Sequence, residues 1–151
     1  LLNLHLMKYK AMKFFACIAF LLMPCALFAQ QRIPLDDPLQ LKQFYESIEK
    51  TVDQYTSSLK LETWQVFKID STLSHDYMEM MKELESLNKA RVANVDLFQK
   101  TQDKWNEQIY NSFRGILDDA QWQKFLKSGA AKEKKARDKR EAKRGKQIES
   151  K

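Results

Sequence analysis

Apolar residues recur at steps of three and four along most of the chain, from Leu41 to Ile116. This spacing places them on one face of an α-helix, where side chains three and four positions apart are neighbours. All prolines and glycines lie outside the 76 residues from Leu39 to Arg114, so no helix breaker interrupts the pattern. The pattern therefore predicts an all-α protein without β-sheet, built as an extended helical hairpin or a small bundle of about four helices.

The first helix is predicted to begin at Asp37, with Pro38 at the first helical position, where its missing N–H is not needed. Gln40 lies three residues beyond this cap, the spacing of a capping box. The weak helix formers Thr56-Ser57-Ser58 predict that the helix frays before Lys60.

A bend is expected at Ser86-Leu87-Asn88, because serine and asparagine favour caps and turns over helix interiors. The alternative is an unbroken helix, on the order of 80 Å long at about 1.5 Å per residue. Such a rod could not bury its apolar stripe alone and would predict a dimer or a long coiled coil. Both possibilities remain open at the level of sequence.

A Leu-x-x-x-Gln frame near the end of the apolar pattern, from Leu117 to Gln121, predicts the start of another helix. Asp118 stands three residues before Gln121, as in a capping box. Leu117 and Trp122 occupy the two positions of a hydrophobic staple, which would set the angle at which the chain enters the helix.

The same frame occurs earlier, from Leu61 to Gln65, with Val66 as the second half of the staple. Glu62 occupies the cap position in this copy. Because glutamate is a poor cap, Thr63 is an alternative start, with the frame shifted by one residue. Either way, the sequence predicts a second helix corner.

Residues 1–29 are expected to be upstream residues and a secretory signal peptide. Three lysines precede the apolar run from Phe14 to Ala29, which is followed at once by polar residues. The run is shorter than the roughly 20 residues of a membrane span and contains Pro24. We expect cleavage after Ala29 and export to the periplasm. A lipoprotein anchored at Cys25 is the alternative.

Cleavage there would remove both cysteines, Cys17 and Cys25. The chain that remains could then form no disulfide, thiol nucleophile or cysteine metal site. This composition is compatible with an oxidising compartment.

Charge divides the rest of the chain into a body and a tail. Residues 30–126 carry 12 basic and 16 acidic side chains, a net charge of −4, whereas residues 127–151 carry 11 basic and 4 acidic ones, a net charge of +7. We therefore expect a helical domain over residues 30–128 and a basic tail over residues 129–151, either a solvated helix extension or disordered. The tail could make weak contact with an anionic surface. It has no aromatic residue on which bases could stack, so no nucleic acid partner is expected.

The sequence does not favour an enzyme. His75 is the one histidine beyond the leader, and its neighbours Ser74 and Asp76 would not face it on a helix. His75, Glu79 and Glu83 are spaced by four and would share a helical face, a weak candidate metal site. Zinc prefers a set of ligands richer in nitrogen and sulfur. We therefore expect no cofactor and no catalytic residue.

Five large side chains are candidates for a surface that binds partners, because a thin helical protein of this size has little interior in which to hide them. Flexible thioethers and amphipathic rings suit promiscuous binding. Burial inside a single core is the alternative. The candidates are Trp64, Met78, Met81, Trp105 and Trp122.

The two frames resemble the repeated LTxxQ signature of the Spy/CpxP family of periplasmic stress proteins, with Glu62 and Asp118 in place of the threonines. The positions that match the signature are Leu61, Gln65, Leu117 and Gln121. The resemblance implies a small helical periplasmic protein, forming antiparallel dimers, that binds unfolded clients without ATP or tunes envelope-stress signalling.

On this basis we expect an exported, non-enzymatic binding protein that acts on unfolded or envelope proteins, as a homodimer. One alternative is a regulatory or structural partner of one specific envelope protein. Another is a periplasmic protein that binds metal or polyanions.

Overall fold

The structure is a computed structural model that describes residues 37–149 of the chain. Every regular element in this range is helical, which confirms the all-α prediction. The expected signal peptide over residues 1–29, its cleavage after Ala29 and both cysteines lie outside the described residues. Among the helices that are described, none combines the length and the apolar character needed to cross a membrane.

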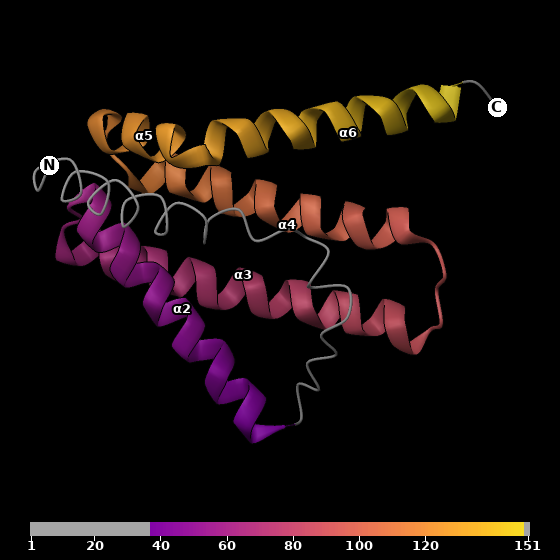
Figure 1. Ribbon diagram of the computed structural model, residues 1–151, viewed down its shortest axis with the longest axis horizontal. Coiled ribbons are helices and arrows are strands. Elements are labelled where there is room, and N and C mark those ends of the chain that lie inside the picture. The colour runs from indigo at the N-terminus through magenta and orange to yellow at the C-terminus, as the bar shows by residue number, and fades with distance from the viewer. Residues whose placement is uncertain (1–36, 150–151) are drawn as a thin grey trace, which may run out of the picture. The chain divides into compact units, whose positions relative to one another are not determined.

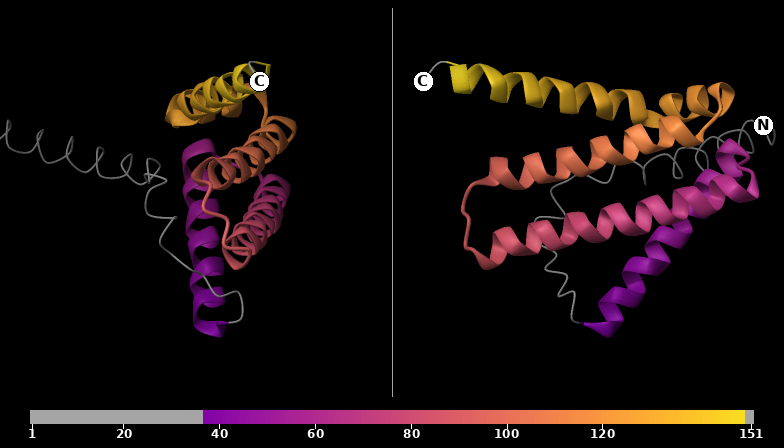
Figure 2. Two further views of the ribbon diagram at one scale, coloured as in Figure 1. Left: turned by 90° about the vertical axis from the view of Figure 1, so that its right-hand side faces the viewer. Right: turned by 180° about the vertical axis from the view of Figure 1, so that it is seen from behind.

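The described helices form a hairpin with one further helix on each of two sides (Figures 1 and 2). Helices α3 and α4 run antiparallel and make the most extensive contact, α2 crosses α3, and α6 lies along α4. The short helix α5 turns the chain between α4 and α6. The elements are α2 (Pro38–Leu59), α3 (Thr63–Lys89), α4 (Val95–Ile116), α5 (Asp119–Phe125), the π-helical segment η2 (Leu126–Ala130) and α6 (Ala131–Glu149).

Helix α2 begins where the sequence predicted, with Asp37 as its cap. The Asp37 carboxylate accepts from the Leu39 N–H at 2.9 Å, one residue earlier than a capping box with Gln40 requires. The expected fraying is not seen, because α2 continues to Leu59. Lys60 then adopts a left-handed conformation (φ 55°), and its N–H donates to the Thr56 carbonyl.

The bend between α3 and α4 lies four residues later than predicted. Asn88 remains helical, and the chain turns over residues 90–94, where Arg91 takes a positive φ of 52°. Asn94 caps α4 by accepting from the Asp96 N–H at 3.0 Å. The predicted bend residues Ser86 and Asn88 thus remain in the last turn of α3. The break also rules out the single long rod.

The tail is helical from Ala131 to Glu149, so of the two alternatives for residues 129–151 the structure shows the helix. Gly129 makes the turn into α6 with φ 122° and ψ −15°, a left-handed conformation that glycine adopts without steric penalty. Among the described residues, this helix contributes no side chain to the hydrophobic core, and its arginines bind carboxylates of α4.

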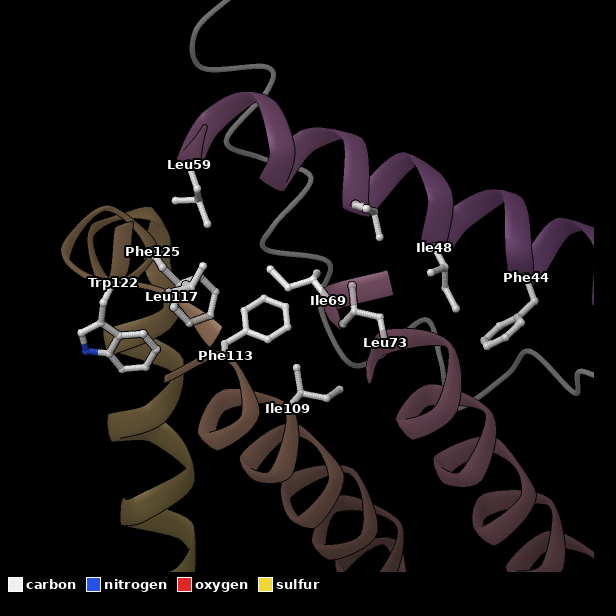
Figure 3. Packing of buried hydrophobic residues seen from close by; sticks show 11 residues of the cluster. Phe44, Ile48, Leu59, Ile69, Leu73, Ile109, Phe113, Leu117, Trp122 and Phe125 are labelled. Carbon is white, nitrogen blue, oxygen red and sulfur yellow. The ribbon is translucent and has the colours of Figure 1, made fainter. Parts of the chain in front are cut away.

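The core lies where α2, α3, α4 and α5 meet. Figure 3 shows its side chains converging from these helices, with Phe113, Ile69 and Leu73 the most completely buried. Phe113 contacts Phe125 and Tyr55, with ring centroids 5.2 and 5.3 Å apart. Burial of this aromatic and aliphatic cluster is the main force that joins the helices.

Candidate functional site

The two predicted helix corners meet through a pair of buried glutamines. Gln65 lies in the first turn of α3 and Gln121 in the first turn of α5, 56 residues apart in the chain. The Gln65 Nε2 donates to the Gln121 Oε1 at 2.7 Å, and the Gln121 Nε2 donates to the Gln65 Oε1 at 2.9 Å. The two side chains therefore form a reciprocal amide pair. We call the place where this pair joins the two helix starts the glutamine corner.

Each glutamine also reaches back to the residue that caps its own helix. The Gln65 Oε1 accepts from the Glu62 N–H at 2.9 Å, and the Gln121 Oε1 accepts from the Asp118 N–H at 3.0 Å. The Asp118 carboxylate completes its capping box by accepting from the Gln121 N–H at 2.7 Å. Glu62, and not Thr63, is the cap residue of α3.

The remaining amide hydrogens go to carbonyl groups at the C-terminal ends of α4 and α2. Gln65 donates to the Ile116 carbonyl at 3.0 Å, and Gln121 donates to the Lys60 carbonyl at 3.4 Å. Each amide thus uses both donors and both acceptor positions. Because their hydrogen-bonding capacity is fully used, these glutamines tie four helix ends together and offer no free group for catalysis.

The leucines of the two frames also have a structural role. Leu117 is buried in the core, and Leu61 packs against it. Trp122 is only 8% exposed and contacts Tyr110 and Phe125, with ring centroids 4.9 and 5.4 Å apart. Trp122 was proposed as part of a partner surface, and this is wrong, because its staple position carries the ring into the core.

The other candidates for that surface are divided among different environments. Met78 and Met81 are partly buried and pack against the core. Trp105 is half-buried, and its indole N–H donates to Glu83 at 2.8 Å. Trp64 alone among the five is largely exposed, at 52%. The predicted Trp/Met face is therefore not continuous.

An open groove of about 700 Å³ lies between α2 and the first half of α3. Phe67 and Tyr45 line it and are 72% and 48% exposed. Trp64 does not line the groove, but it lies three residues before Phe67 on α3 and is 52% exposed. We call Tyr45, Trp64 and Phe67 the aromatic triplet. Phe67 is exposed although it is apolar, because helical periodicity does not show how far an apolar stripe is covered.

The groove is acidic as well as apolar. Glu49, Asp53 and Asp70 line it together with Val52 and Val66. Of the side chains that line it within the described part of the chain, none is basic. The groove therefore offers an apolar floor and a negative potential to whatever enters it.

The candidate metal residues are occupied by other partners. His75 Nδ1 lies 2.8 Å from the Asp76 carboxylate, and Glu79 is bound by Lys82. Glu83 accepts from Lys104 at 2.6 Å, and this hydrogen bond holds the pKa of Glu83 below its ordinary value. Over residues 37–149, no three His, Cys, Asp or Glu side chains are grouped so that they could hold a metal ion.

A buried carboxylate on α4, missed by sequence reasoning, receives α6. Asp103 is 7% exposed and binds Arg140 and Arg144, each through an Nη2 at 2.6 Å. One turn further along α4, Glu107 accepts from Arg137 Nε at 3.2 Å, and the Arg137 guanidinium lies over the Tyr110 ring. We call this contact between α4 and α6 the arginine clasp. Its members are too far apart in sequence for any local pattern to predict their pairing.

Comparisons of the chain with protein-family models, with curated proteins and with solved structures found no match. The features that bear on its function are the groove, the glutamine corner and the charge distribution.

Proposed function

We propose that this chain is an exported, non-enzymatic binding protein that holds unfolded segments of envelope proteins without ATP. The observation that carries the proposal is the exposed aromatic triplet beside the groove between α2 and α3. Large aromatic side chains that remain in water while the neighbouring core is closed are typical of a surface that a partner covers.

The groove favours occupants that are both apolar and basic. Insertion of an apolar side chain beside Phe67 and Tyr45 would remove apolar surface of both partners from water. Glu49, Asp53 and Asp70 would pair with lysine or arginine of the same segment. Extended segments that mix the two residue classes are common in unfolded proteins, so the groove would serve many clients.

The glutamine corner supports this function by holding the groove open. Helix α2 meets α3 at the Lys60 turn, and the Gln121 amide binds the Lys60 carbonyl there. The corner thus fixes the end of α2 nearest to Trp64. The resemblance of both frames to the LTxxQ signature adds support for an envelope-stress role.

A light-scattering assay tests the proposal. The test uses the chain from Gln30 onward, which contains the whole core found in residues 37–149, from Phe44 to Ala130. At stoichiometric amounts it should suppress the aggregation of several unrelated, chemically denatured clients. The double variant Trp64→Ser, Phe67→Ser should lose most of this suppression and keep its helix content by circular dichroism.

The matched control is Val95→Ser, Leu97→Ser, which removes two other exposed apolar side chains at the start of α4. This control should suppress aggregation as well as the unmodified chain does. Equal suppression by the Trp64/Phe67 variant would exclude the groove as the client site. If the unmodified chain suppresses nothing, general chaperoning is wrong, and a regulatory role with one specific envelope protein takes its place.

A further inference from the structure

Helix α6 carries its arginines and five of its six lysines on different faces. The sixth, Lys134, pairs with Glu107 of α4, which also binds Arg137. Arg137, Arg140 and Arg144 all bind carboxylates of α4, so the arginine clasp sets the rotation of α6 about its own axis. With about 100° per residue, these three positions share an arc of about 60°.

The other five lysines of α6 form a separate stripe. They follow each other at steps of three and four and are all exposed: Lys132, Lys135, Lys139, Lys143 and Lys146. They share an arc of about 80°, centred about 130° around the helix from the arginines, and span about 21 Å of its length. We call this stripe the lysine face.

The positive charge of the lysine face is not neutralised by acidic side chains on the same side of α6. The acidic residues of α6 (Glu133, Asp138, Glu141 and Glu149) fall outside its arc, and none of its five lysines takes part in an ion pair described for residues 37–146. Like charges four residues apart destabilise a helix slightly. An anionic partner would relieve this repulsion.

We propose that the lysine face binds the phosphate headgroups of an anionic lipid surface. A straight row of point charges on one side of a helix matches a flat layer of phosphates. The arginines, which suit bidentate recognition, are held in the clasp, and the lysines left outside bind by charge with little geometric demand. The net negative body favours an orientation in which α6 faces the lipid and the groove remains accessible.

A nucleic acid is the less favoured partner of this face. The described part of α6 contains no aromatic side chain on which a base could stack. The proposal does not depend on client binding, because the lysine face and the groove lie on different helices.

Cosedimentation with vesicles tests the proposal, using the chain from Gln30 onward. Vesicles of equal parts phosphatidylglycerol and phosphatidylcholine should bind it, and vesicles of phosphatidylcholine alone should not. Binding should weaken steeply as salt rises from about 0.05 M to about 0.5 M. The triple variant Lys135→Gln, Lys139→Gln, Lys143→Gln should bind about 100-fold more weakly, at about 5-fold per lysine.

Two matched variants separate position from total charge. Lys42→Gln, Lys50→Gln, Lys68→Gln removes the same charge from exposed sites on α2 and α3 and should bind like the unmodified chain. Lys135→Arg, Lys139→Arg, Lys143→Arg keeps the charge of the face and should also bind. Equal weakening by the α2/α3 variant, or failure of the unmodified chain to bind the anionic vesicles, would overturn the proposal. Stronger binding to duplex DNA than to these vesicles would reassign the face to nucleic acid.

Discussion

The glutamine corner and the arginine clasp both join segments distant in sequence, but by different physical means. At the corner, two neutral amides with fully used hydrogen-bonding capacity sit beside a core of buried rings and aliphatic side chains. At the clasp, α6 docks on α4 mainly through guanidinium–carboxylate contacts around Asp103 and Glu107.

This difference predicts two levels of stability in one small protein. Hydrophobic burial and neutral hydrogen bonds change little with salt, whereas the partly exposed members of the clasp, Arg140 and Glu107, are open to screening by salt. The clasp also leaves Arg137 Nη2 and Arg144 Nε buried without a hydrogen-bond partner in the described structure, which reduces its net contribution. We therefore expect α6 to open locally before the corner unfolds.

The largest effect should come from the core at the corner. Phe113→Ala removes a fully buried ring that contacts Tyr55 and Phe125, and it should lower the free energy of unfolding by about 3–5 kcal/mol. Urea unfolding followed by circular dichroism measures the change. Phe67→Ala is the control, and its effect should stay within about 0.5 kcal/mol, because that ring is mostly in water. Similar losses for both variants would contradict this account of the core.

The amide pair should have the next largest effect. Gln65→Leu and Gln121→Leu should each lower the free energy of unfolding by about 2 kcal/mol, since each leaves backbone groups and the other amide unsatisfied. The double variant should lose less than the sum, by about 1 kcal/mol or more, because the residues contact each other. Gln123→Leu, at an exposed position of α5, is the control and should change little. Strict additivity would show that the amides act independently.

The clasp should have the smallest effect on global stability and the largest on α6. Asp103→Asn removes the charge that holds Arg140 and Arg144, so amide hydrogens of α6 should exchange faster while those of α3 keep their protection. We expect a loss of about 1–2 kcal/mol in the docking of α6. High salt should produce part of the same effect in the unmodified chain. Asp96→Asn is the control, since Arg144 approaches that exposed carboxylate only to 4.0 Å. Equal exchange along α3 and α6 would show that they unfold as one unit.

Much of the corner could be predicted from local pattern. The 3.6-residue period, the cap at Asp37 and the two Leu-x-x-x-Gln frames each report a backbone preference within a few residues. The frames therefore placed helix starts at Glu62 and Asp118. The position of the turn between α3 and α4 was predicted too early, because Asn88 and Asn94 have the same local preference for caps and turns. Local preference therefore does not decide between the two positions.

The candidate site was less predictable, since exposure depends on which helices come together. Trp64 lies within the first frame and is 52% exposed, whereas Trp122 holds the staple position after the second frame and is 8% exposed. Helix α5 places Trp122 against Tyr110 of α4, whereas Trp64 bonds only to Glu62 beside it, at 2.7 Å. Their positions relative to the cap therefore differ, but how far each ring is covered depends on the helices that pack around it.

By itself, the sequence determined that this protein is helical, where most of its helices begin and that its charge is concentrated in the tail, because these properties arise from neighbouring residues. Only the tertiary structure decided that Gln65 meets Gln121, that Asp103 receives α6 and that the lysine face remains outside. These contacts join residues more than 30 positions apart, and their formation depends on the burial of the shared core.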